Sequence, residues 1–149
     1  MSSAFGFRHD LRVRFVETDA QGVVYHSNFL VYADVARVEY FRALKKADDL
    51  TEWREERGYD VVLVHAECDF RASARFDDAL SVWVRLGHMG NTSFGFEFRI
   101  MRGDTLVCEV MTRQCAIDRA SRTPRPLPDE FKNALRTFEA SLHPKRAEP

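Results

Sequence analysis

Residues 15–42 read FVETDAQGVVYHSNFLVYADVARVEYFR and divide into a polar turn followed by a helical pattern. The turn-forming residues from Thr18 to Gly22 interrupt the alternation that precedes them. From Phe29 onward, apolar residues recur at intervals of three and four, which predicts a long amphipathic helix over residues 29–47. The expected buried stripe consists of Phe29, Ala33, Ala36, Tyr40, Ala43, Leu44 and Ala47. A second apolar flank, formed by Val31, Val35 and Val38, is a candidate contact surface for another subunit.

Alternating apolar and polar residues predict five strands around this helix. The first is expected over residues 11–17, with Leu11, Val13 and Phe15 on one side. The other expected elements are strands over residues 61–70, 80–86, 94–100 and 106–117, and a terminal helix over residues 128–142. One strand, one long helix and then four strands is typical of an α+β domain whose single antiparallel sheet buries one face on the helix. We therefore expect the sheet to wrap the helix.

The composition indicates one globular domain over residues 1–149. Its formal net charge of -1 gives no bulk field that would attract nucleic acid or an anionic membrane. Three cysteines without a Cys-x-x-Cys spacing fit a reducing compartment, and no long apolar run is present, so we expect a cytoplasmic protein. The five histidines form no ligand-spaced cluster, and we predict no metal. A Gly-x-Ser-x-Gly motif, typical of serine hydrolases, is absent from the sequence.

The segment from Phe15 to Arg42 resembles the signature of the 4-hydroxybenzoyl-CoA thioesterase family of hotdog-fold proteins. An Asp, a Gly three residues later, a His and an Asn precede a helix of the expected length. The resemblance continues through residues 68–78, 90–94 and 123–128. It implies the hotdog fold, an acyl-CoA thioesterase activity, and a homodimer or homotetramer with active sites at the subunit interface.

Residues of the turn and the helix entry are the catalytic candidates. By resemblance, Asp19 is the catalytic carboxylate, which attacks the thioester carbonyl directly or activates a water. Backbone N–H groups near His26 would polarise the carbonyl, and the His26 imidazole is a candidate for proton transfer. Without the resemblance, an Asp in this position reads more readily as a turn former or a cap. Gly22, Tyr25 and Asn28 are the neighbouring candidates, with Asn28 expected to cap the helix or orient the loop.

Contacts to coenzyme A are expected from two further segments. Asn91, Thr92 and Ser93 resemble a family segment beside the pantetheine arm. Arg71 and Arg75 could reach phosphates, although a solvated strand end is the more ready interpretation of each arginine taken alone. Coenzyme A is part of the substrate, so no separate cofactor is expected.

Two other functions compete with the thioesterase interpretation. A hotdog dehydratase would leave the C–S bond intact, but such enzymes resemble one another around a differently placed His and acidic residue. A non-catalytic acyl-CoA-binding protein would bind the thioester without turnover. The sequence leaves the acyl group open, because distant strands and two subunits would assemble its pocket.

Overall fold

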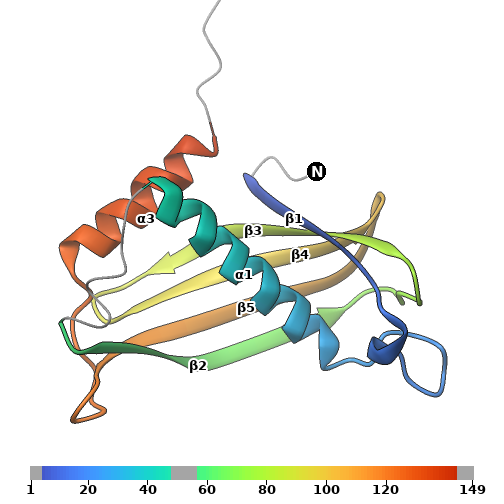
Figure 1. The fold of residues 1–149 in the computed structure, drawn as a ribbon, viewed down its shortest axis with the longest axis horizontal. Coiled ribbons are helices and arrows are strands. Elements are labelled where there is room, and N and C mark those ends of the chain that lie inside the picture. Colours follow the sequence, from blue (N-terminus) through green and yellow to red (C-terminus); the bar gives the residue numbers. More distant parts are fainter. Residues whose placement is uncertain (1–4, 48–56, 144–149) are drawn as a thin grey trace, which may run out of the picture.

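A computed structural model describes residues 5–47 and 57–143 of the chain (Figure 1). Its centre is a five-stranded antiparallel sheet with the strand order β1-β3-β4-β5-β2. The elements in chain order are β1 (Phe7–Arg12), the short 3-10 helix η1 (Phe15–Glu17), α1 (Asn28–Ala47), β2 (Tyr59–Phe70), β3 (Ala79–Met89), β4 (Ser93–Arg102), β5 (Thr105–Asp118) and α3 (Asp129–Ser141). This architecture confirms the predicted α+β class.

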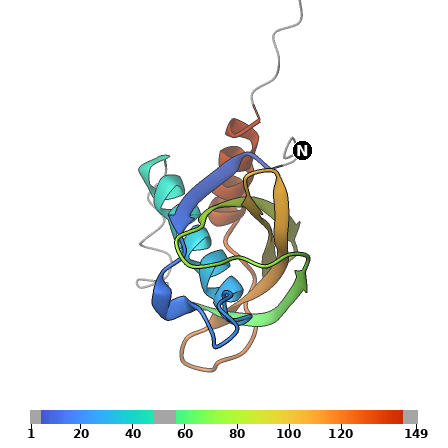
Figure 2. The ribbon, with the colours of Figure 1, turned by 90° about the vertical axis from the view of Figure 1, so that its right-hand side faces the viewer.

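The sheet curls around α1, as the end-on view in Figure 2 shows. The helix buries five residues of the predicted stripe: Phe29, Ala33, Ala36, Tyr40 and Leu44 are each at most 4% exposed. Ala43 is partly buried, and the side chain of Ala47 lies outside the described residues. Alternate residues of β4, among them Phe94, Phe96 and Phe98, face the helix and are buried as well. Small alanines on the stripe let the helix approach the aromatic face closely. The expected hotdog arrangement, a long helix wrapped by an antiparallel sheet, is confirmed.

The terminal helix α3 closes the end of the core beside the C-terminal half of α1 (Figure 1). Phe131 stacks on Phe41 and also meets Phe94 edge-on. The Tyr40 hydroxyl donates a hydrogen bond of 2.5 Å to the Glu139 carboxylate, which fastens α3 to α1. The predicted helix over residues 128–142 is therefore present, with its boundaries moved inward by one residue at each end.

The first strand differs from the sequence prediction. It spans Phe7–Arg12 instead of residues 11–17, and residues 15–17 form η1. Val13 exchanges backbone hydrogen bonds with Asp77 and Asp78, and the Arg14 N–H then binds the Glu17 carboxylate, which turns the chain into a 3-10 helix. Phe15 consequently lies 75% exposed, and the expectation that it shares a buried face with Val13 is wrong.

The two edges of the sheet differ in length and in side chains. At one edge, β1 has six residues and carries the charged residues Arg8, Asp10 and Arg12. At the other, β2 has twelve residues, and its Leu63 and Val64 are 59% and 57% exposed. The predicted apolar flank of α1 is also exposed, by 41–47% at Val31, Val35 and Val38. β2 therefore places two exposed apolar side chains on an edge of the sheet, although the same strand also carries Glu67 and Asp69.

Candidate active site

Asp19 lies in a tight turn between η1 and α1. Its backbone N–H donates to the Val23 carbonyl at 2.9 Å, and its own carbonyl accepts the Gly22 N–H at 3.0 Å. Gly22 has φ +76, a left-handed backbone conformation that glycine adopts without a Cβ clash. The Gln21 N–H donates to Oδ1 of Asp19 at 2.8 Å. Within the described chain the other carboxylate oxygen, Oδ2, has no hydrogen-bond partner and is available to a reacting atom.

The chain enters α1 immediately after this turn. The N–H groups of Asn28, Phe29 and Leu30 donate to carbonyls three residues earlier. By contrast, the N–H groups of His26 and Ser27 have no acceptor among residues 5–47 and 57–143. Both residues are exposed, and unpaired N–H groups at a helix start carry a partial positive charge. The helix entry therefore offers two donors to a developing negative charge.

Asn28 orients the loop and does not cap the helix. Its Nδ2 donates to the Glu17 main-chain carbonyl at 2.8 Å, which also accepts the Tyr25 N–H at 2.9 Å. Within the described residues no backbone N–H donates to Oδ1 of Asn28, so the side chain does not cap the helix start. Of the two roles expected for Asn28, the structure shows the second.

Glu17 is a residue of this site that the sequence interpretation missed. The alternation placed it only as the last residue of the first strand. It is 8% exposed, and its carboxylate accepts hydrogen bonds from the Arg14 N–H, the Arg14 guanidinium and the Tyr32 hydroxyl. Burial alone would raise the pKa of Glu17, but these hydrogen bonds outweigh it and lower the pKa below its usual value. Burial and the Glu17 carboxylate raise the pKa of Tyr32. An acidic residue five positions before a turn glycine gave no sequence signal for such a contact.

Aromatic side chains surround the helix entry. The rings of Tyr25 and His26 are 4.2 Å apart between centroids, and the His26 ring meets Phe70 of β2 at 6.4 Å. Phe70 also packs on Phe29. Tyr25 is 45% exposed and His26 is exposed too, so both remain accessible to a ligand at the helix entry.

The segment with Arg71 and Arg75 lies beside the Asp19 turn, because the Val24 N–H donates to the Ala74 carbonyl at 2.8 Å. The Arg71 side chain is paired with Glu109 at 3.1 Å. Arg75 is exposed, and its guanidinium has no acidic partner in the described part of the chain. Arg75 is thus the better placed of the two to meet an anion.

The predicted pantetheine segment lies at the opposite end of the sheet. The Thr92 carbonyl accepts the Ala116 N–H near the end of β5. Arg71, in the segment beside the Asp19 turn, donates its N–H to the Val107 carbonyl near the start of β5. Nine residues of strand separate Val107 from Ala116, which is about 30 Å along β5. One chain therefore does not bring Asn91, Thr92 and Ser93 to Asp19. At the hairpin itself, the Ser93 hydroxyl pairs with His88 at 2.9 Å.

Similarity to known proteins shows the family and the fold of the chain. Residues 13–135 match the family model described as the thioesterase-like superfamily. This chain belongs to the thioesterase-like superfamily. It is 30% identical over 130 residues to an acyl-CoA thioesterase, YbgC, from Haemophilus influenzae, covering 87% of this chain and 94% of that protein. It is also 30% identical over 131 residues to a 1,4-dihydroxy-2-naphthoyl-CoA hydrolase from Nostoc punctiforme, covering 88% of this chain and 87% of that one.

Among solved structures, a 1,4-dihydroxy-2-naphthoyl-CoA thioesterase from Synechocystis superimposes with a TM-score of 0.77. The two are 25% identical, over 87% of this chain and 94% of that one. A structure from Thermus thermophilus is 30% identical and superimposes with a TM-score of 0.76, over 88% of this chain and 98% of that one. The fold of this thioesterase-like chain is therefore shared along nearly its whole length.

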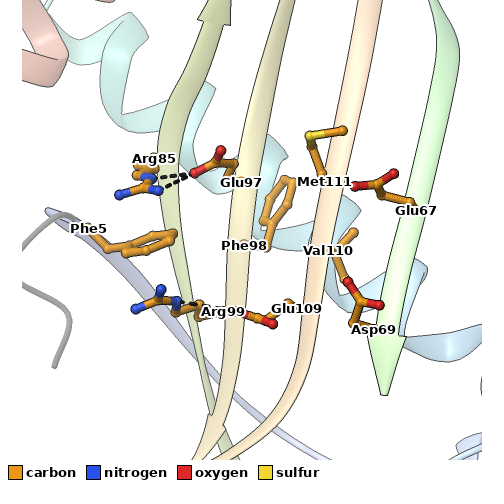
Figure 3. A pocket seen from close by; sticks show the side chains of 10 residues that line it. All are labelled: Phe5, Glu67, Asp69, Arg85, Glu97, Phe98, Arg99, Glu109, Val110 and Met111. Carbon is orange, nitrogen blue, oxygen red and sulfur yellow. Dashed lines mark hydrogen bonds and ion pairs between the residues drawn. The ribbon is translucent and has the colours of Figure 1, made fainter. Parts of the chain in front are cut away.

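A shallow groove of about 260 Å³ crosses the face of the sheet that points away from α1 (Figure 3). Phe5 lies there between the guanidinium groups of Arg85 and Arg99, and these arginines pair with Glu97 and Glu109. The groove is lined by Phe5, Glu67, Asp69, Arg85, Glu97, Phe98, Arg99, Glu109, Val110 and Met111. None of the predicted site residues of this thioesterase-like chain lines it.

The described residues offer neither a cluster of metal ligands nor a reactive thiol at Cys68 or Cys108. Residues 5–47 and 57–143 contain no cluster of three or more His, Cys, Asp or Glu side chains that could hold a metal ion. Burial raises the pKa of the Cys108 thiol to about 12, and it also raises the pKa of Cys68. A buried thiol that stays protonated is a poor nucleophile. No helix in the described ranges is both long and apolar enough to cross a membrane.

Proposed function

We propose that this chain is an acyl-CoA thioesterase, which hydrolyses an acyl-coenzyme A to a free carboxylic acid and CoA. The observation that carries the proposal is that a free carboxylate oxygen and two free backbone N–H groups lie in the same short segment, the turn that leads into α1. Asp19 presents an unpaired carboxylate oxygen, and the helix entry a few residues later presents the unpaired N–H groups of His26 and Ser27. Thioester hydrolysis needs both, a nucleophile or base and donors for the carbonyl oxygen.

The proposed reaction begins when the thioester carbonyl oxygen accepts hydrogen bonds from the His26 and Ser27 N–H groups. These donors stabilise the negative charge that develops on that oxygen. Asp19 either removes a proton from the attacking water or attacks the carbonyl carbon itself, forming an anhydride that water then cleaves. In the first route the C–S bond breaks when the tetrahedral intermediate collapses to the acid, and in the second it breaks as the anhydride forms, before water attacks. The CoA thiolate takes up a proton, for which the exposed His26 imidazole is the proposed source.

We further propose that the working unit is a homodimer or a larger homo-oligomer paired through β2. Two copies of one strand related by a two-fold axis pair antiparallel, which continues the sheet and covers Leu63 and Val64. The Phe70 end of β2 lies beside α1 and the Asp19 turn, and the Tyr59 end lies at the Asn91 end of the sheet. Antiparallel pairing therefore sets the Asp19 turn of one copy beside the hairpin of the other.

In this arrangement, Asn91, Thr92 and Ser93 of the partner would flank the pantetheine arm, and Arg75 would meet a CoA phosphate. The Arg71 ion pair with Glu109 makes Arg71 the weaker candidate. Apart from CoA as part of the substrate, the chemistry requires no cofactor. The resemblance to 4-hydroxybenzoyl-CoA thioesterases and the naphthoyl-CoA relatives favour an aromatic acyl group. Three free cysteines favour the cytoplasm as the place of action.

The test is the release of free thiol from a panel of aromatic and aliphatic acyl-CoAs by the wild type and by Asp19→Asn. The substitution keeps the side-chain volume and removes both the nucleophile and the base, so we expect a folded protein of unchanged oligomeric mass with turnover lowered by at least about a thousandfold. Binding of acyl-CoA without thiol release by the wild type would instead indicate a non-catalytic acyl-CoA-binding protein. Full activity of Asp19→Asn would rule out the proposed mechanism.

A further inference from the structure

Glu17 stands out among the charged residues because it is buried beside the candidate site. It is the only charged residue below 9% exposure in the described ranges. Its Oε1 accepts the Arg14 N–H at 2.8 Å and the Tyr32 hydroxyl at 3.1 Å, and its Oε2 accepts the Arg14 guanidinium at 3.0 Å. Burying a carboxylate costs free energy unless it is hydrogen-bonded, so the contacts to Arg14 and Tyr32 are what hold the Glu17 carboxylate in this position.

The main chain of the same residue makes a second set of contacts. The Glu17 carbonyl accepts the Tyr25 N–H at 2.9 Å and the Asn28 amide at 2.8 Å. Asn28 begins α1 and Tyr32 lies one turn further along it. Glu17 therefore contacts the start of α1 through its carbonyl at Asn28 and through its side chain at Tyr32, and it lies two residues before Asp19.

We infer that Glu17 is a positioning residue, which fixes the Asp19 turn against the first turn of α1. The inference rests on the proposed function. Asp19 lies two residues after Glu17. The His26 and Ser27 N–H groups lie between Tyr25 and Asn28, the two residues that donate hydrogen bonds to the Glu17 carbonyl. A change at Glu17 shifts the carboxylate relative to the donors, and a displacement of 1 Å can cost about a hundredfold in rate.

A matched contact on the same helix separates positioning from stability alone. Tyr40 also donates its buried hydroxyl to a carboxylate, that of Glu139, at 2.5 Å. It lies eight residues beyond Tyr32, about 12 Å along the helix, and its partner is on α3. Tyr32→Phe and Tyr40→Phe each remove one hydroxyl from a Tyr–Glu contact, but only Tyr32→Phe touches the residue that holds the Asp19 turn.

The experiment measures kcat and KM of the full-length variants with the acyl-CoA that the wild type hydrolyses fastest. We expect Tyr32→Phe to lower kcat about tenfold and Glu17→Gln about a hundredfold, with KM within about twofold of the wild type. Tyr40→Phe should keep kcat within about twofold. Equal losses of kcat in the two tyrosine variants would overturn the inference.

Two additional measurements show which proposal has failed. In the Asp19→Asn background, Glu17→Gln should lower the residual rate less than about twofold, because both substitutions act through the Asp19 carboxylate. A further loss of rate of about a hundredfold in the double variant would overturn the inference. Amide exchange at Tyr25, which needs no turnover, should quicken at least about tenfold in Glu17→Gln and stay unchanged in Tyr40→Phe. Unchanged exchange in Glu17→Gln would overturn the inference even in an active enzyme. Altered exchange in a protein without thioesterase activity would overturn the proposed function, and with it the positioning role.

Discussion

Replacement of Gly22 by alanine should impair the Asp19 turn through the backbone alone. Gly22 has φ +76, and no atom lies within 4 Å of the position that a Cβ would occupy. The substitution therefore creates no clash, and its cost is the left-handed conformation of an L-residue, about 1–2 kcal/mol. For a chain of this length, such a loss lowers Tm by roughly 2–4 °C for each kcal/mol.

Gly103 supplies a matched control for this substitution. It has φ +57 in the β4–β5 hairpin, and the space around its absent Cβ is equally open. Thermal unfolding should show similar losses for Gly22→Ala and Gly103→Ala. Thiol release should fall about tenfold or more only in Gly22→Ala, because only this turn carries Asp19. Wild-type turnover in Gly22→Ala, at a lowered Tm, would refute the claim that the turn geometry controls catalysis.

Two more predictions concern the exposed strand edge and the buried carboxylate. Leu63→Lys should place a charge at the centre of the β2 edge and yield a monomer with little thiol release. The control Thr105→Lys, at the start of β5, should keep the oligomeric mass. Light scattering after size exclusion measures the mass of both variants, and an intact Leu63→Lys oligomer would exclude β2 pairing. The pKa of Glu17 is lowered in the folded protein, so its carboxylate stabilises the fold fully above about pH 4.5, and this contribution is lost as the pH falls through the lowered folded value. The difference in free energy of unfolding between the wild type and Glu17→Gln should therefore shrink only in acid, and a constant difference from pH 3 to pH 7 would contradict this assignment.

The order of the elements could be predicted from the sequence because each has a clear periodicity. The three-and-four spacing of α1 identified its buried stripe, and the alternation of Phe94, Phe96 and Phe98 identified the inner face of β4. The start of the chain could not be predicted so well. Leu11, Val13 and Phe15 alternate as a strand does, but the hydrogen bond from the Arg14 N–H to the Glu17 carboxylate ends the strand early. A side-chain contact of this kind leaves no periodic trace.

The candidate site was predictable only in its local part. Asp19, Gly22 and the helix entry are consecutive in sequence, so their proximity follows from one turn. The Glu17 contact with Tyr32 depends on how the helix packs, which spacing does not reveal. The place of Asn91 could not be predicted at all, because the contacts that hold its hairpin run to β5 and to Leu127.

The most direct test of the two-chain active site is subunit complementation between Asp19→Asn and Asn91→Trp. Asn91 is exposed, so the bulky side chain should obstruct the pantetheine path without unfolding the hairpin, and each variant alone should be nearly inactive. In mixed dimers, one of the two sites combines the intact Asp19 of one chain with the intact hairpin of the other. After the subunits are unfolded and refolded together in equal amounts, we predict about a quarter of the wild-type thiol release. No activity above the sum of the two separate variants would contradict an active site shared between two chains.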